Sequence, residues 1–412
     1  MHDRFRSHQE MGDVFMMVTP GRNWLYIANP DALMDMFRRR AEFPQCIELT
    51  EVLNVFGTNL GTVEGQQWKT QRKMIATCFN EPNNEIVWSE SLSLARDMLK
   101  YWVKKPSISS SADDLRTLSL HVLAGAGFGK SFEFEGHDER RNTSLSGDYK
   151  TSLQMILENC ILIMDEAKSG AGLTESEIYG NMFMLNFAGH DTTAHTLTFA
   201  IHFLAANPAV QDWVSEEART VLGERDQDQA GWDYAASFPR LRRCFAVLLE
   251  TLRLYTPVPV AKWTAGGTAS LEAGGRTYVV PPNTMVIPSY AAVHTEPKYW
   301  GSDSLTWRPS RWIQAAGAPG MEELITPQKG TFLGWSEGAR DCPARKFSQV
   351  EFVATVATLL RDWRVDPVPL DGGESLDHAR KRVLDLIEKD SGPVLLQQML
   401  HPERASLTWT KR

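Results

Sequence analysis

The sequence predicts a mainly α-helical fold with small β-sheets. Long stretches carry apolar residues at helical spacing, whereas the strand-like stretches are short and bounded by turn residues. The helical stretches are residues 63–104, 112–124, 174–206, 208–222 and 238–255, and the strand-like stretches are residues 14–28, 264–289 and 393–410. No internal repeat and no long linker divides the 412 residues, so we expect a single domain over residues 1–412.

The N-terminal half begins with strand signals and continues with helices. After the strand-like residues 14–28, residues 31–40 have the pattern of a short helix. The helical region at residues 63–104 contains Asn and Pro residues at 80–84, which favour a boundary between two helices.

The helix with the strongest signals spans residues 174–206. Thr174 and Glu177 form a capping-box pair at its start, and Asn207 and Pro208 end it. At 1.5 Å per residue this helix is about 50 Å long. Its polar residues exclude a membrane span.

The C-terminal half returns to strands twice. The helical residues 238–255 are ended by Thr256 and Pro257, and the strand-like residues 264–289 contain an Ala-Gly-Gly turn at 273–275. A last long helix is expected to start near Pro343, before the final strands.

Composition narrows the class of protein. The 43 basic and 51 acidic residues give a net charge of −8, which argues against nucleic acid as the main partner. The five cysteines form no CxxC or Cys/His pattern, so neither a disulfide framework nor a structural zinc site is predicted. The first 24 residues lack the apolar run of a signal peptide or membrane anchor, and the chain as written is expected to be soluble.

One alternative is a nucleotide site. The segment AGAGFGKS at 124–131 is close to a phosphate-binding loop, and CILIMDEA at 160–167 could be an apolar strand ending in Asp165 and Glu166. Against a P-loop ATPase, the first glycine is replaced by Ala124, and the preceding residues have helical rather than strand character.

A second alternative lies on the long helix. Asp191 and His195 are four residues apart and could share a metal ion with His202, although a third ligand at proper spacing is missing. In the same helix the run AGHDTT at 188–193 contains poor helix formers, which predicts a local distortion at a functional site.

The third candidate is Cys342. If Pro343 is the first helical residue, Cys342 caps the helix, and the helix dipole lowers the pKa of its thiol. Such a sulfur serves as a nucleophile or as a metal ligand. No histidine base can be assigned to it from the sequence, whereas an iron ligand needs no base.

Five motifs in order resemble the haem-thiolate monooxygenases of the cytochrome P450 superfamily. WSEGARDCPA at 335–344 resembles the cysteine loop, and AGHDTT at 188–193 resembles the oxygen-activating groove of the long helix. The other three are WKTQR at 68–72, ETLR at 250–253 and WRPSRW at 307–312. GWSEGARDCP and AGFGKSFEFEG look most like filamentous-fungal members.

The resemblance implies a cytochrome P450 fold, a haem cofactor and a role for each matching residue. Cys342 would be the axial thiolate ligand of the iron, and Asp191 and Thr192 would conduct protons to dioxygen. Glu250, Arg253 and Arg311 would form a buried structural network. The residues implied in haem binding are Trp68, Arg72, Ala188, Gly189, Trp335, Gly338, Arg340 and Ala344.

The implied reaction inserts one oxygen atom of O2 into an apolar organic substrate. Electrons would come from an external NADPH-dependent reductase, because no flavin or nicotinamide motif is present. A basic face for that reductase could be formed by Lys69, Arg72, Lys73, Arg345 and Lys346. Full-length eukaryotic relatives sit on the cytosolic face of the endoplasmic reticulum membrane.

The chain departs from the family pattern in four places. Trp335 stands where phenylalanine is usual, and Ala344 stands where glycine is usual and would crowd the approach to the porphyrin. The N-terminus is short, and the lid helices that roof the substrate pocket are expected to be partly missing between Ile163 and Leu173. A catalytically impaired haem-binding relative or an incomplete gene product is therefore an alternative.

Overall fold

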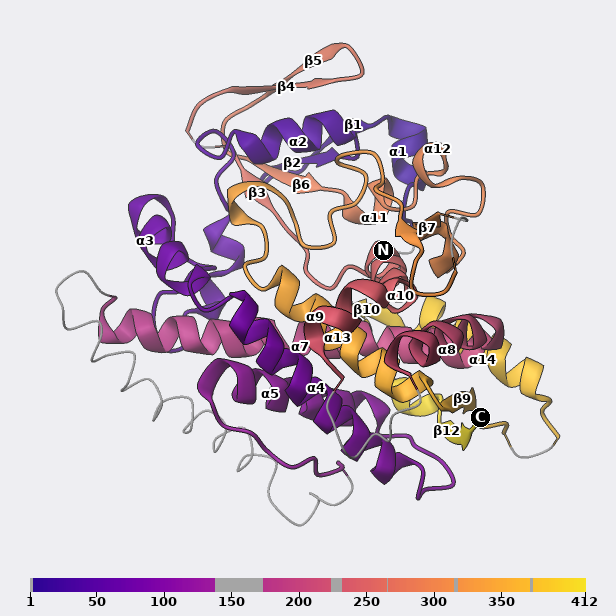
Figure 1. Cartoon of the computed structure of the whole chain (residues 1–412). Coiled ribbons are helices and arrows are strands. Elements are labelled where there is room, and N and C mark those ends of the chain that lie inside the picture. Colours follow the sequence, from indigo (N-terminus) through magenta and orange to yellow (C-terminus); the bar gives the residue numbers. More distant parts are fainter. Residues whose placement is uncertain (1–2, 138–172, 224–231, 265, 315–317, 371–372) are drawn as a thin grey trace.

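The computed structural model describes residues 3–137, 173–223, 232–264, 266–314, 318–370 and 373–412. Helices dominate and the sheets are small, as predicted (Figure 1). The helices are α1 (Arg6–Met11), α2 (Pro30–Arg38), α3 (Gly65–Ala76), α4 (Glu81–Trp102), α5 (Ser111–Phe128), α7 (Glu175–Ala206), α8 (Pro208–Leu222), α9 (Tyr234–Ser237), α10 (Arg242–Leu254), α11 (Tyr290–Val293), α12 (Pro297–Trp300), α13 (Arg345–Leu360) and α14 (Leu376–Lys389). The expected loss of lid helices between Ile163 and Leu173 falls outside the described residues.

The main core is a layer of packed helices. Figure 1 shows α7 crossing the width of the molecule, with α4 and α5 on one side of it, and α13 contacts α4 and α7. Trp102, Phe199 and Phe352 are fully buried in this core. The indole of Trp102 donates a hydrogen bond to Asp114 Oδ2 at 2.8 Å, which satisfies both polar groups where water is excluded.

The largest sheet lies at the other end of the molecule, beneath α2 (Figure 1). Its strand order is β1-β2-β6-β3, with β1 and β2 antiparallel and β2 and β6 parallel. The alternating side chains of these strands and the apolar face of α2 form a second core. The strands are β1 (Val14–Val18), β2 (Asn23–Ile27), β3 (Lys262–Trp263), β4 (Ala269–Ala273), β5 (Arg276–Val280), β6 (Thr284–Pro288), β7 (Ile313–Gln314), β8 (Glu323–Leu324), β9 (Trp363–Pro367), β10 (Ser391–Pro393), β11 (Gln397–Met399) and β12 (Leu407–Lys411).

Helix α7 begins and ends where its sequence signals predict. The Thr174 hydroxyl accepts a hydrogen bond from the Glu177 N–H, the Glu177 carboxylate accepts one from the Thr174 N–H, and Asn207 is the C-terminal cap. The expected distortion is wrong, because α7 is α-helical throughout. The Thr192 hydroxyl donates to the Ala188 carbonyl oxygen at 2.8 Å, so it bonds within the helix rather than opening it.

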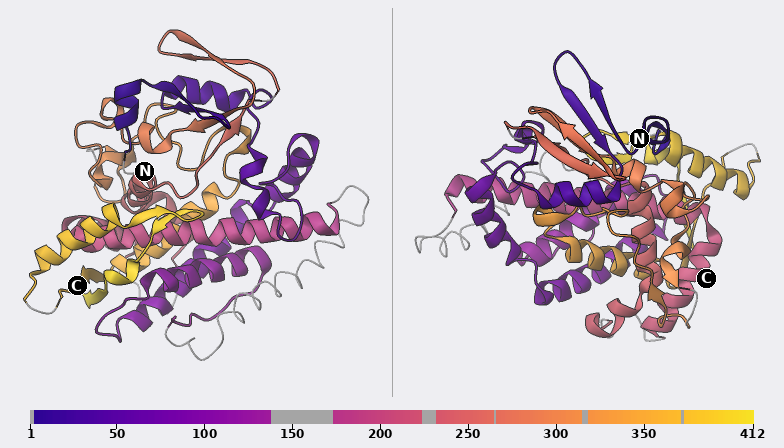
Figure 2. Two further views of the ribbon diagram at one scale, coloured as in Figure 1. Left: turned by 180° about the vertical axis from the view of Figure 1, so that it is seen from behind. Right: turned by 90° about the horizontal axis from the view of Figure 1, so that it is seen from above.

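Two helix predictions need correction. The predicted helix at 238–255 starts with a 3₁₀ turn, Phe238–Arg240, because Pro239 interrupts regular α-helical bonding, and α10 begins only at Arg242. Helix α14 was not predicted, although Ser375 caps it by accepting from the His378 N–H. Figure 2 shows α14 beside α7, and the two helices are in contact.

No helix in the described part of the chain is long and apolar enough to cross a membrane.

Candidate active site

Cys342 lies in a tight loop that precedes α13. Its backbone N–H donates to the Trp335 carbonyl oxygen at 2.9 Å, and the Ser336 N–H donates to the Leu333 carbonyl oxygen at 2.9 Å. Ser336 and Gly338 have positive φ angles of 62° and 77°. These turns fold residues 335–342 into a compact loop, which we call the cysteine loop. Its C-terminal end leads into α13.

The prediction that Cys342 caps the helix is wrong. Helix α13 begins at Arg345 with Ala344 as its N-terminal cap, two residues after the cysteine. Burial raises the pKa of the Cys342 thiol, and a hydrogen bond from the Ala344 backbone opposes this shift. The helix dipole therefore does not make Cys342 a free thiolate, whereas a bound metal ion would deprotonate it.

Two unusual residues of the loop fit their positions. The Trp335 indole donates to the Ser348 hydroxyl at 2.9 Å, which fixes the ring against the first turns of α13. Ala344 has φ −95°, an ordinary value for a residue with a side chain, and its methyl packs against the main core. The backbone conformation at 344 does not require glycine.

Four cations gather near Trp68 of α3. The guanidinium carbons of Arg40 and Arg340 lie 4.5 and 4.8 Å from the centre of the Trp68 ring. Lys262 of β3 is 4% exposed and lies close enough to Arg340 and Arg40 for their charges, in addition to burial, to lower its pKa. Burial and the charge of Arg72 likewise lower the pKa of Arg340. We call Arg40, Arg72, Lys262 and Arg340 the cation cluster.

The cation cluster has more positive than negative charge. Its two carboxylates are Glu64, 2.8 Å from Arg340, and Asp341, 2.8 Å from Arg72. Burial and then the charges of Arg340 and Arg40 lower the pKa of Lys262 to about 8, against an opposing effect of Glu64. The four cations exceed the two carboxylates by two charges, and Arg345, 3.3 Å from Asp341, adds a further positive charge at the edge of the cluster, so this partly buried region suits an anionic ligand.

This arrangement fits the two propionates of a haem whose iron is held by Cys342. Arg340 Nε is buried and has no hydrogen-bond partner among the described residues, so a donor there is available to a ligand. Arg72 has fewer donors left for a propionate than expected, because it already donates to the carbonyl oxygen and to a carboxylate oxygen of Asp341 at 2.7 and 2.8 Å. In this structure Arg72 ties α3 to the cysteine loop.

Residues 188–193 lie in the middle of α7, where α5 packs against it. A Cβ on Gly189 would lie 3.1 Å from a methyl carbon of Leu123, so this glycine permits close packing of α5 on α7. Asp191 Oδ1 lies 3.2 Å from Arg116 Nε and 3.5 Å from His190 Nε2. The proposed roles of Ala188, Gly189, Asp191 and Thr192 toward haem and dioxygen stay predictions.

Glu250, Arg253 and Arg311 meet in one buried network. Arg253 forms two bonds of 2.8 Å to the Glu250 carboxylate, and Arg311 Nε donates to the same group at 2.8 Å. The side chains of Glu250 and Arg253 are completely buried. Arg253 also donates to the carbonyl oxygens of His294 and Ser304, and the Trp312 indole donates to Glu250, so the network joins α10 to the segment before the cysteine loop.

Sequence reasoning missed several residues of the site. Lys262 and Arg40 had no distinguishing signal, because Lys262 follows a loop and Arg40 ends a run of three arginines. Glu64 lies just before the WKTQR motif and Asp341 lies within WSEGARDCPA, so their pairing with arginines could have been suspected there. Arg116 lies on α5, far in sequence from Asp191.

The two alternatives from the sequence are not supported. The glycines of AGAGFGKS lie at the end of α5, with Gly129 as a left-handed cap, whereas a phosphate-binding loop precedes a helix. Asp165 and Glu166 are outside the described residues. His202 is buried with Nδ1 against the Thr198 carbonyl oxygen, and the described residues contain no group of three possible metal ligands.

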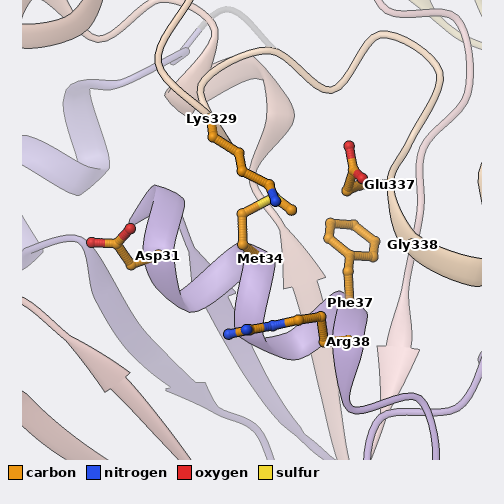
Figure 3. Close-up of a pocket in the computed structure, with 7 residues that line it drawn as sticks. All are labelled: Asp31, Met34, Phe37, Arg38, Lys329, Glu337 and Gly338. Atoms are coloured by element: carbon orange, nitrogen blue, oxygen red, sulfur yellow. The ribbon is translucent and has the colours of Figure 1, made fainter.

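A cavity of about 300 Å³ lies between α2 and the cysteine loop (Figure 3). Phe37 and Met34 of α2 form its apolar part, and Gly338 and Glu337 contribute the loop side. Cys342 does not line it, so this cavity is not where the sulfur would meet a ligand.

Comparison with known proteins agrees with this geometry. The family model of cytochrome P450 matches residues 137–390. The chain is 25% identical to a cytochrome P450 monooxygenase of Arthrobotrys oligospora, over 90% of this chain and 79% of the relative. It is 26% identical to cytochrome P450 monooxygenase 124 of Postia placenta (94% and 83%) and 24% identical to cyclooctat-9-en-7-ol 5-monooxygenase of Streptomyces melanosporofaciens (85% and 82%). These relatives support neither an ATPase nor a catalytically impaired protein.

Proposed function

Because the chain belongs to the cytochrome P450 family, we propose that it is a haem-dependent monooxygenase that inserts one oxygen atom from O2 into an apolar organic substrate. The observation that carries this proposal is that the half-buried cysteine loop, which carries Cys342, occurs together with a cation cluster whose four cations exceed its two carboxylates by two charges. The cysteine loop suits a ligand of the haem iron, and the cation cluster suits the two propionate carboxylates of the same haem.

Each residue then has a task. Cys342 would bind the iron as thiolate, with Trp335 beside the sulfur and Gly338 and Ala344 shaping the loop. Arg340, Lys262 and Arg40 would pair with the propionates. The Trp68 ring would orient the guanidinium groups of both arginines through cation–π contacts. When bound, the haem supplies the redox chemistry, and its thiolate ligand favours O–O cleavage.

The substrate side is supported by aromatic residues near the start of α7. Phe56 lies 5.6 Å from Phe183, and Phe183 stacks on Phe187 at 6.1 Å, next to Ala188. Such a row of rings offers dispersion contacts and no charge, which suits an apolar substrate. Thr192 and Asp191 would hold and pass the protons that convert the second oxygen atom to water.

The reaction consumes one O2, two electrons and two protons, and gives hydroxylated product and one water. We propose an NADPH-dependent reductase as the source of the electrons. Lys69 and Lys73 are exposed on α3, and Arg345 starts α13 beside the cysteine loop, so an acidic partner could dock close to Cys342. Lys346 contributes less, because it is partly buried against the Phe238 ring.

The decisive experiment is a spectrum of the reduced protein with carbon monoxide after expression with a haem supply. We expect the Soret shift of a thiolate-ligated ferrous complex, lost in Cys342→Ala and kept in Cys78→Ala, which removes an exposed cysteine. A haem-free wild type, or an unchanged spectrum in Cys342→Ala, would overturn the proposal.

Turnover is tested with Thr192→Ala. With reductase, NADPH and a panel of apolar compounds, we expect the wild type to form product, and the variant to form less product and more hydrogen peroxide. If the wild type binds haem but makes no product from any compound, the monooxygenase activity is excluded while haem binding stands.

A further inference from the structure

Asn181 of α7 connects three parts of the chain. It is almost completely buried, with 3% of its surface exposed. Its Oδ1 accepts a hydrogen bond from the Leu60 N–H at 2.8 Å, and its Nδ2 donates to Gln71 Oε1 of α3 at 3.0 Å and to the Glu177 carbonyl oxygen at 2.8 Å. Because the oxygen and both donors of the amide are used, these partners determine the orientation of the side chain.

Residues 53–62 form a loop that is folded by its own hydrogen bonds, and we call it the Asn59 loop. Asn59 Nδ2 donates to the Leu53 carbonyl oxygen at 3.0 Å, and Asn59 Oδ1 accepts from the Gly61 N–H at 3.0 Å. The Asn59 N–H donates to the Thr62 hydroxyl oxygen at 3.0 Å. Since these bonds fix the internal shape of the loop, its contacts with other elements determine where it lies.

The Asn59 loop packs directly against the first turns of α7. A Cβ built on Gly180 would lie 2.4 Å from the Gly57 carbonyl oxygen, and one built on Gly57 would lie 2.1 Å from the Ser176 carbonyl oxygen, so backbone contacts backbone. Phe56 precedes Gly57, and the centre of its ring lies 5.6 Å from that of the Phe183 ring on α7. The position of the Asn59 loop on α7 therefore decides whether these two rings meet.

The Asn59 loop is also attached to the cysteine loop. Arg340 Nη1 donates to the Leu60 carbonyl oxygen at 3.3 Å, and Arg340 Nη2 donates to the Val63 carbonyl oxygen at 2.6 Å. Leu60 is thus held through its N–H by Asn181 and through its carbonyl group by Arg340. A change at Arg340 would disturb the cation cluster as well, whereas a change at Asn181 acts on the loop and leaves that cluster in place.

We propose that Asn181 is a positioning residue that holds Phe56 against Phe183 and thereby sets the preference of the site for ligands with an apolar ring. This inference rests on the proposed function, in which these rings face the substrate. Contacts between aromatic rings add attraction beyond the area that they bury, so a fixed Phe56 favours a ligand ring and a displaced Phe56 does not. Asn181 acts through Phe56.

Two substitutions separate positioning of the loop from general stability. Asn181→Asp keeps an oxygen for the Leu60 N–H but loses the donors to Gln71 and Glu177, whereas Asn181→Leu keeps a similar volume and loses all three hydrogen bonds. A buried ionisable group beside other oxygen atoms is costly, so Asn181→Asp should lower the melting temperature at least as much as Asn181→Leu. If Asn181 only stabilised the fold, Asn181→Asp would change the ligand preference at least as much too.

The test uses the haem-loaded protein and two probe ligands, imidazole and 4-phenylimidazole. Both bind ferric iron through a ring nitrogen, and only the second adds an apolar ring. Spectral titration gives the two dissociation constants, and hydrogen exchange followed by mass spectrometry gives the protection of the Asn59 loop. The control is Asn84→Leu, which removes an asparagine of α4 that is also 3% exposed and donates to Glu81 Oε1 at 3.2 Å.

We expect Asn181→Leu to weaken the binding of 4-phenylimidazole several-fold relative to imidazole and to speed exchange in the Asn59 loop. Asn181→Asp and Asn84→Leu should stay close to the wild type in both measurements. Phe56→Ala, at an exposed position, should lose the same preference, and adding Asn181→Leu to it should cause no further loss.

The inference is overturned if Asn181→Leu equals Asn84→Leu in both measurements, or if Asn181→Asp loses as much of the preference as Asn181→Leu. A wild-type preference in Phe56→Ala overturns it as well, and this result does not depend on whether Asn181→Leu folds. These outcomes count against the inference alone when the wild type has its thiolate carbon monoxide spectrum. A wild type without that spectrum overturns the proposed function and this inference together.

Discussion

Gly338 of the cysteine loop and Phe37 of α2 touch through their backbones. A Cβ built on Gly338 would lie 2.8 Å from the Phe37 carbonyl oxygen, and Gly338 has φ +77°. The same Phe37 ring lies 5.8 Å from the Lys262 ammonium group. Helix α2 therefore positions the cysteine loop and one member of the cation cluster at once.

The first prediction follows from this contact. Gly338→Ala should lower the free energy of unfolding by about 2–4 kcal/mol, because it adds positive-φ strain and an overpacked contact. Haem content should fall as well, since the loop carries Cys342. Chemical denaturation and the haem absorbance per protein measure the two effects.

The matched control is Gly275→Ala. Gly275 has a similar φ of +74°, but nothing lies within 4 Å of its virtual Cβ. Gly275→Ala should lower the free energy of unfolding only by the cost of backbone strain, about 1–2 kcal/mol, and should leave the haem content normal. Equal losses in the two variants would mean that the contact with Phe37 contributes nothing.

The second prediction concerns the buried Glu250. Glu250→Gln should destabilise the protein by about 3–5 kcal/mol, because it leaves Arg253 and Arg311 with an uncompensated buried charge. Thermal unfolding of the holoprotein measures this loss. Glu42→Gln breaks an exposed pair with Arg39 at the same three-residue spacing and should change the melting temperature little. A small effect of Glu250→Gln would show that the network is dispensable.

The third prediction concerns Lys262. Lys262→Met should weaken haem binding about tenfold or more, because it removes a buried cation that the propionates would neutralise. Transfer of haem to excess apomyoglobin gives the dissociation rate. Lys329→Met removes an exposed lysine near the cysteine loop and is the control. If both variants retain haem equally well, Lys262 does not belong to the propionate site.

Local signals in the sequence predicted most of the fold. The capping box at Thr174, the turn at 273–275 and the helix start at Pro208 are short-range features, and each appears where expected. The failures have local causes too. Pro343 resembled a first helical residue, but the turns of the cysteine loop continue to Ala344 before α13 begins.

The site was predictable only in part. The motifs identified those functional residues that lie within a few positions of Cys342, Glu250 and Trp68 in the sequence. Lys262 reaches Arg340 and Arg40 only because β3 pairs with β6, and Arg116 reaches Asp191 only because α5 packs on α7. Such contacts depend on tertiary packing, which no spacing in the sequence encodes.

The last prediction concerns pH and Glu351, a fully buried residue of α13. Burial raises the pKa of its carboxyl group to about 8, with a smaller opposing effect of Ser119, and neither oxygen has a hydrogen-bond partner among the described residues. The unfolded chain loses this proton near pH 4.5 and the folded protein near pH 8. Between these values the unfolded state binds fewer protons, so the stability of the folded state falls as pH rises.

The loss between pH 4.5 and 8 is at most about 5 kcal/mol. Glu351→Gln cannot ionise, so its unfolding free energy should decline less over this range than that of the wild type, and the difference should level off above pH 8. Urea unfolding at pH 5, 6.5 and 8 measures it, with Glu10→Gln on the surface of α1 as the control. If the unfolding free energies of the wild type and Glu351→Gln change by the same amount from pH 5 to 8, Glu351 is ionised in the folded protein and must be paired or hydrated there.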